Sequence, residues 1–281
     1  MPGVSGVAHP WGQACMSPQP VRVSLGPYVL VRQLTDGRLG ERWLALHERS
    51  QTSHTLHRFA PCHDKAEQRR LLEAFETLSA FRHGHVLPIG EFSFAGDGRG
   101  WLVTPYSGNQ EGLVTLADVL EAKGGQLGPY EAERAVAHLL EAFGAAHAVG
   151  LHHGPLSIDE VLVDRHGRVM IELFGLARRL QGLDRGNTEL IRDEIGSVAQ
   201  LAYRLLTGLG ADEPRIAAGR LNRRLTRAWD EWLEAGLDPS GGFESATAAL
   251  GALPSARTDG EPREVTVRTV IGRLRSSLLS R

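Results

Sequence analysis

The chain has 281 residues, of which 42% are hydrophobic and 23% charged, as in an ordinary globular protein. Lysine and arginine number 31 against 33 aspartate and glutamate residues, so the charge balance does not predict binding to nucleic acid or to a membrane surface. Two cysteines, Cys15 and Cys62, are too few for a disulfide scaffold or a four-cysteine zinc site, and no apolar run reaches the roughly 20 residues of a membrane span. We therefore expect a cytoplasmic protein without a transmembrane segment or a secretory signal.

The N-terminal part of the chain predicts a short leader and then a small β-rich unit. Residues 1–26 contain four prolines and four glycines and no periodicity, which predicts a flexible leader. Three β-rich runs follow, at 27–34, 41–48 and 53–60, separated by turn-like segments as in an antiparallel meander. Residues 64–82 carry apolar residues at three- and four-residue spacing and predict a helix, and two more strands are expected near 86–94 and 99–106.

The remainder of the chain predicts a mainly helical unit. Helices are expected at 113–122, 129–148, 192–207, 222–236 and 243–253, with a small hairpin near 161–173. We therefore predict an α+β fold with a flexible leader at 1–26, a small antiparallel lobe at 27–106, a larger helical lobe at 107–253 and a basic tail at 254–281. The tail is polar at its start and strand-like at 265–271.

Five short stretches follow one another along the chain, namely YVLVRQLTDGRLGERWLALH, FRHGHVLPIGEF, LHHGPLSIDEVLVDRHGRVMIELFGLARRL, IGSVAQLAYRLLTG and LEAGLDP. In this order they resemble the protein kinase fold, of the bacterial serine/threonine type, from Pro27 to Leu253. Each stretch is weak alone, but their common order and spacing make the resemblance specific. The resemblance implies a two-lobed fold with ATP and Mg²⁺ held between the lobes.

The phosphate-covering turn of that family is altered in this chain. The family pattern G-x-G-x-x-G-x-V keeps Gly37 and Gly40, but Thr35 replaces the first glycine and Arg42 replaces the valine that covers the adenine ring. A guanidinium group inside an apolar nucleotide slot is costly unless it is paired. We therefore expect no ATP bound in the usual pose.

The family's phosphate-binding ion pair is also absent. His57 stands at the position of the lysine on the third strand, and Ala74 stands at the position of its glutamate partner on the helix. Neutral imidazole is a poor substitute for a permanent cation. The only lysines, Lys65 and Lys123, lie elsewhere in the pattern.

The catalytic and metal-binding positions are changed as well. Pro155 replaces the aspartate that accepts the substrate proton, Glu160 replaces the metal-binding asparagine, and Leu173 replaces the aspartate of the D-F-G motif. Glu160 and Glu172 remain a weak alternative pair of metal ligands. The segment from Leu176 to Ile191 is short and has no A-P-E triplet.

Two scaffold positions of the family differ too. Glu194 stands where the family has a buried aspartate, and the arginine expected after Asp238-Pro239 is replaced in the run 240–242. We expect both changes to affect details of the fold rather than chemistry.

Retained packing residues together with lost chemistry are typical of a pseudokinase. We therefore expect a catalytically inactive module that binds, scaffolds or regulates a protein partner, with an active kinase among the candidates. One alternative is a divergent ATP-binding serine/threonine kinase, in which Arg38, Arg42 or His57 holds phosphates and an acid holds Mg²⁺. The candidate acids for that metal are Asp159, Glu160 and Glu172. A nucleotide sensor without catalysis is a third possibility.

Several other features favour structural roles. The twelve histidines show no metal-ligand spacing with a carboxylate or a cysteine, and His153 is expected to bond backbone near Phe174. Cys62 precedes a helix, which can lower a thiol pKa, but an inert thiol is the simpler expectation. Residues 263–281 carry five arginines and one acid, so this tail is either solvated or docks to a partner or an anionic surface.

Overall fold

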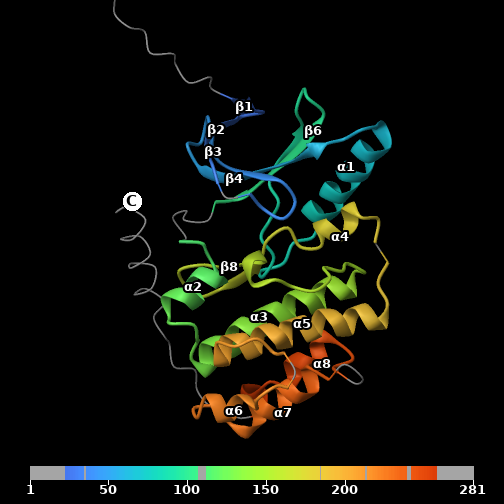
Figure 1. The fold of residues 1–281 in the computed structure, drawn as a ribbon. Helices are drawn as coiled ribbons and strands as arrows, with labels where there is room; N and C mark the ends of the chain where they lie inside the picture. The colour runs from blue at the N-terminus through green and yellow to red at the C-terminus, as the bar shows by residue number, and fades with distance from the viewer. Residues whose placement is uncertain are drawn as a thin grey trace, which may run out of the picture.

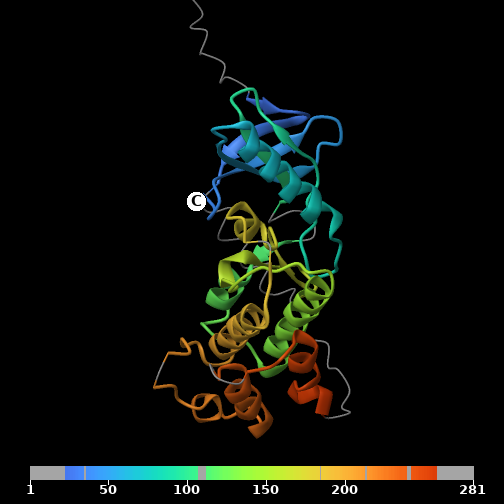
Figure 2. The same cartoon turned by 90° about the vertical axis from the view of Figure 1, so that its right-hand side faces the viewer.

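The computed structural model describes residues 23–34, 36–106, 112–183, 185–212, 214–238 and 242–257. The predictions for most of the leader, for Thr35 and for the tail beyond residue 257 lie outside these residues. The described chain is a mixed α+β structure, with a curled antiparallel sheet at one end and helices at the other (Figure 1). A view turned by 90° keeps the same order of the two ends (Figure 2).

The sheet has six strands in the order β1-β2-β3-β4-β6-β5, all paired antiparallel. The strands are β1 Ser24–Leu25, β2 Tyr28–Gln33, β3 Glu41–His47, β4 Ser53–Pro61, β5 Phe92–Phe94 and β6 Arg99–Pro105. The predicted meander is confirmed as β2, β3 and β4. The predicted strand at 86–94 is wrong for its first part, because Val86 bridges to Ile171 in the helical part instead of joining this sheet.

Helix α1 Lys65–Ala80 packs on the sheet and confirms the predicted helix. The Asp64 side chain accepts a hydrogen bond from the Glu67 amide and caps the first turn. Phe75 is fully buried in a cluster with Phe59 of β4 and Leu102 of β6. Burial of this apolar face, more than helix propensity, holds α1 in place.

The helical part is built around α3 Pro129–Ala148 and α5 Thr188–Thr207, which lie side by side (Figure 1). The other helices are α2 Leu116–Ala122, α4 Leu176–Leu180, α6 Ala218–Leu221, α7 Arg227–Gly236 and α8 Ala246–Gly251, with 3₁₀ turns at Ile158–Glu160 and Pro254–Arg257. A small sheet joins β7 Val114–Thr115, β8 Val161–Val163 and β9 Val169–Ile171. The β8–β9 pair confirms the predicted hairpin.

Several helices differ from the sequence prediction. The predicted helix at 113–122 is wrong at its start, because Val114–Thr115 form β7 and α2 begins at Leu116; α8 is shorter than the predicted 243–253, and α6 was not predicted. Helix α5 begins at Thr188 rather than 192, because the Asn187 side chain caps the Leu190 amide. The predicted helix at 222–236 is wrong at its start, since the Asn222 side chain donates to the Leu206 carbonyl and α7 begins at Arg227. Helix α4 was not predicted; Leu176 on it is fully buried in the cluster beneath α1.

In the described residues, no helix is both long enough and apolar enough to span a bilayer. The order of elements, with a curled antiparallel sheet first and helices after it, is compatible with a protein-kinase-like fold.

Candidate functional site

A cavity of about 620 Å³ lies between the sheet-containing part and the helical part. Its walls come from the β2–β3 turn, from β4, from the loop at 153–160 and from the segment at 172–183. The cavity brings together most of the residues singled out from the sequence, namely Gly37, Gly40, Arg42, His57, Pro155, Glu160, Glu172 and Leu173. Ala74 lies on the buried face of α1 instead.

The β2–β3 turn is a tight hairpin whose glycines have a steric role. Gly37 and Gly40 form an isolated antiparallel bridge, with the Gly37 amide 2.9 Å from the Gly40 carbonyl oxygen. A Cβ atom at Gly40, where φ is +149°, would lie 2.4 Å from the carbonyl oxygen of Arg58. Only glycine fits so close to the neighbouring strand. The turn therefore packs onto β4.

Arg42 extends from β3 into the cavity and pairs with Glu172. Its Nη2 atom lies 3.7 Å from Glu172 Oε2, and the two side chains are 20% and 10% exposed. Burial raises the pKa of Glu172, while the Arg42 guanidinium acts to lower it and Glu160 to raise it. The guanidinium expected to obstruct the nucleotide slot is thus paired inside the site.

His57, which the resemblance places at the position of the family's lysine, is a buried side chain on β4. Its Nε2 atom lies 3.1 Å from Thr104 Oγ1 and 3.6 Å from Glu172 Oε1. Burial, together with the charge of Arg42, lowers the pKa of His57 to about 3. The imidazole therefore supplies no positive charge to the cavity near neutral pH. Its expected helix partner, Ala74, offers no charge either.

Glu160 and Glu172 are neighbours across the cavity wall. The Glu172 amide donates to the Glu160 carbonyl oxygen at 2.8 Å. The Glu160 carboxylate accepts from the Ser157 amide at 2.9 Å and lies 3.4 Å from Arg38 Nη1, whose side chain is 64% exposed. Both acids proposed as weak alternative metal ligands thus border one cavity, and each already has partners.

The Leu173-Phe174-Gly175 motif has a packing role. Leu173 has a φ of +49°, unusual for a residue with a side chain, and packs against the apolar cluster beneath α1. Phe174 is buried, with its ring centroid 5.5 Å from that of Phe143. Gly175 has a φ of +70°, and a Cβ atom there would lie 2.6 Å from the His152 carbonyl oxygen. The side chain that the resemblance places at the metal-ligand position is thus apolar and packed against the cluster.

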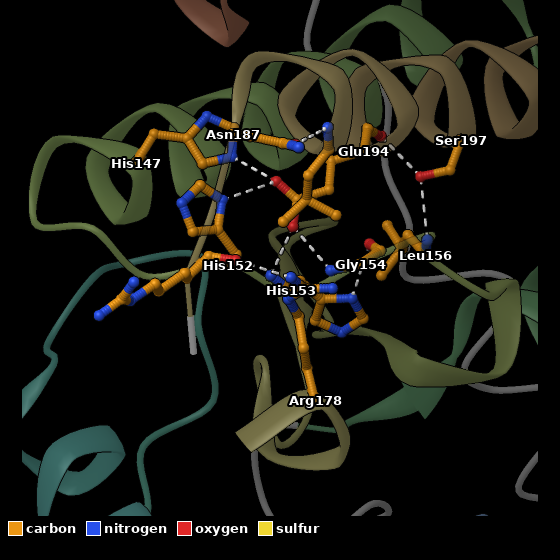
Figure 3. Close-up of polar contacts among 11 residues, drawn as sticks. His147, His152, His153, Gly154, Leu156, Arg178, Asn187, Glu194 and Ser197 are labelled. Carbon is orange, nitrogen blue, oxygen red and sulfur yellow. Dashed lines mark hydrogen bonds and ion pairs between the residues drawn. The ribbon is translucent and has the colours of Figure 1, made fainter. Parts of the chain in front are cut away.

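Glu194 anchors the loop that carries Pro155. One carboxylate oxygen, Oε1, accepts from the His153 and Gly154 amides at 2.6 Å each (Figure 3). The other oxygen faces His147 and His152. Burial by itself would raise the Glu194 pKa, but the hydrogen bonds from His147 and from the Gly154 amide hold that pKa below its usual range.

Two side chains behave as the sequence suggested. The His153 Nδ1 atom lies 3.2 Å from the Gly154 carbonyl oxygen, and its ring meets Phe174 edge-on at a centroid distance of 5.1 Å. The pKa of the Cys62 thiol is raised by burial and by Glu67 and Asp64, which favours an inert thiol over a reactive one.

Sequence reasoning missed Arg178 and the grouping of His147 and His152 with Glu194. Arg178 lines the cavity from α4 and donates to the Arg185 carbonyl oxygen at 2.9 Å. His147 and Glu194 lie 47 residues apart in the chain, so no local spacing links them. The only available signal was the histidine-rich run around His152.

Comparison with known proteins agrees with the coarse assignment. No family model matches the chain. The chain is 32% identical over 136 residues to CBL-interacting protein kinase 1 of Oryza sativa subsp. japonica. It is 30% identical over 136 residues to CBL-interacting protein kinase 17 of the same organism. Each of these alignments covers 48% of this chain and 28% of the relative. It is 25% identical over 197 residues to the probable serine/threonine-protein kinase pknA2 of Bifidobacterium longum (strain NCC 2705), covering 67% of this chain and 24% of that protein.

The chain thus matches about a quarter of the length of these curated relatives. These partial similarities support a place in the protein-kinase-like superfamily.

Proposed function

We propose that this chain is a two-lobed, catalytically inactive protein-kinase-like domain, a pseudokinase, that acts by binding a protein partner. The observation that carries the proposal is the pairing of Arg42 and Glu172 beside neutral His57 inside the cavity. These side chains line the cavity that the resemblance assigns to nucleotide phosphates and metal, and the charge of Arg42 is already paired with that of Glu172 within the protein.

The surrounding positions support the same conclusion. Phosphoryl transfer requires a group to orient the attacking hydroxyl and acidic or amide oxygens to hold Mg²⁺. Pro155 has no proton acceptor on its side chain, and Leu173 is directed into an apolar cluster. A regulatory or scaffold role, with an active kinase among the candidate partners, requires only the folded surface.

One observation favours a second candidate, a divergent ATP-binding serine/threonine kinase. Glu160 and Glu172 border the same cavity as Arg38 and Arg42, so two carboxylates and two guanidinium groups lie around one space. In this alternative the carboxylates hold Mg²⁺ and the arginines hold phosphates. Both acids would first have to leave their present partners.

The experiment is thermal unfolding of the full chain with millimolar ATP, in Mg²⁺, in Mn²⁺ and without metal. A ligand at 100 times its Kd stabilises a protein by about 2.7 kcal/mol, which moves Tm by several degrees. We expect no shift in any condition. The matched control is Glu172→Gln, which removes the carboxylate and keeps the size of the side chain.

A phosphoryl-transfer assay on a generic protein substrate completes the test. A metal-dependent Tm shift, or transfer activity, that is lost in Glu172→Gln would overturn the proposal in favour of the divergent kinase. A metal-independent shift without transfer would instead make the domain a nucleotide sensor.

A further inference from the structure

Three potential metal ligands from distant parts of the chain meet behind the loop that carries Pro155. His147 comes from the end of α3, His152 from the loop after it, and Glu194 from α5 (Figure 3). One ligand atom from each lies within 4.8 Å of the other two. We propose that these three side chains bind a divalent transition metal ion, with Zn²⁺ as the best fit.

The chemistry of the three side chains suits zinc. Two imidazole nitrogens and a carboxylate oxygen form a recognised set of zinc ligands in proteins, and a water molecule commonly completes the tetrahedron. The nitrogens that face Glu194 Oε2 are His147 Nε2, at 2.6 Å, and His152 Nδ1, at 3.4 Å. Metal binding requires each imidazole to be neutral, with its proton on the other ring nitrogen.

The distances are close to those of a bound site. Ligand atoms at roughly 2.0–2.1 Å from one zinc ion stand about 3.3 Å from one another in a tetrahedron. The nitrogen–oxygen separations of 2.6 and 3.4 Å bracket that value. A bound ion would require His147 Nε2 and Glu194 Oε2 to move apart from 2.6 Å to about 3.3 Å.

The three side chains of the site are closely packed and largely buried. The side chains of His147, His152 and Glu194 are 11%, 8% and 0% exposed. The His152 ring is pressed against the backbone of Gly186, where an added Cβ atom would lie 1.8 Å from Nε2. Glu194 keeps its orientation because its other oxygen accepts two backbone amides. Such prior ordering reduces the entropy that binding has to overcome.

The charge of the site also favours a cation. Glu194 is a fully buried carboxylate, and the groups that face it are two imidazoles and two backbone amides. A divalent ion would neutralise this buried charge more completely than hydrogen bonds alone. A bound ion would also link α3, α5 and the loop at 152–154, and so stabilise the wall of the cavity.

The test uses the full chain after removal of metal with EDTA. Zn²⁺ is titrated by calorimetry, and Co²⁺ is added separately because its visible absorption reports tetrahedral nitrogen and oxygen ligands. We expect one ion per chain, a tetrahedral Co²⁺ spectrum and a Tm increase of several degrees with excess Zn²⁺.

Two variants and one control make the test specific. His147→Asn and His152→Asn each remove one ligand and should weaken Zn²⁺ binding by about 100-fold or more. Mutation of a residue that only hydrogen-bonds to a ligand typically weakens metal binding by about 10–100-fold. The control, His83→Asn, alters a separate histidine group near His85 and should bind as the wild type does. Circular dichroism without metal establishes that each variant is folded.

Absence of stoichiometric binding to the wild type would overturn the proposal. So would binding that survives in both folded ligand variants, since the ion would then lie elsewhere. Because no nucleotide is present in this assay, its outcome is independent of whether the domain is a pseudokinase.

Discussion

The pairing of Arg42 with Glu172 can be tested by replacing Arg42 with methionine, which keeps much of the side-chain length and removes the charge. Breaking a buried ion pair costs about 3–5 kcal/mol when one charge is left behind. Here the atoms are 3.7 Å apart and the side chains keep 20% and 10% exposure, which reduces the cost. The buried Arg42 Nε atom also has no hydrogen-bond partner among the described residues.

We therefore expect Arg42→Met to lower the free energy of unfolding by about 2 kcal/mol at pH 8, or about 4–8 °C in Tm. The matched control is Arg38→Met, because Arg38 pairs with Glu160 while 64% exposed. Exposed pairs contribute about 0–1 kcal/mol, so this variant should lose at most about half as much stability.

The cost should also depend on pH, with a defined sign. Burial raises the pKa of Glu172 and Arg42 opposes that rise, so removing Arg42 raises the pKa further. A carboxyl group whose pKa is higher in the folded state stabilises the fold below its unfolded pKa, and this contribution is lost as the pH rises through the folded pKa. Arg42→Met should therefore cost more at pH 8 than at pH 5.

The assay is urea unfolding of both variants and the wild type at pH 5 and pH 8. Addition of Glu172→Gln to Arg42→Met should recover part of the loss, since no buried charge then remains unpaired. Equal losses in Arg42→Met and Arg38→Met, or a loss independent of pH, would refute the reasoning.

Three further predictions concern the residues around the cavity. Burial lowers the pKa of His57 to about 3, so protonating this imidazole costs free energy in the folded state. The free energy of unfolding should therefore fall by about 2 kcal/mol between pH 7.5 and pH 5. Urea unfolding should show a smaller fall over this range in His57→Gln. Gly175→Ala should lower the free energy of unfolding by more than about 2 kcal/mol, because the new Cβ atom would meet the His152 carbonyl oxygen. The control is Gly182→Ala, where φ is a similar +71° but no atom lies within 4 Å of the new Cβ; it should cost about 1–2 kcal/mol in the same assay. Leu176→Ala should cost about 2–4 kcal/mol and speed amide hydrogen exchange in α4; unchanged exchange would mean that this burial does not hold α4.

The sequence alone determined the elements whose pattern is strong and local. Helix α3 was predicted at its observed bounds, because Val136, Leu139, Leu140 and Phe143 recur at helical spacing and are all fully buried. The residue types at Pro155 and Leu173 likewise need no structure to be recognised as unable to accept a proton or bind Mg²⁺.

The tertiary structure alone decided which side chains meet. Arg42 was predicted to be costly in the cavity, but its partner Glu172 lies far along the chain and no local pattern links the two. The same holds for His147 and His152 with Glu194, and for α4, whose five residues are held by burial of Leu176 against α1. Periodicity reports which face of an element is buried; long-range packing decides which charges and ligands that burial brings together.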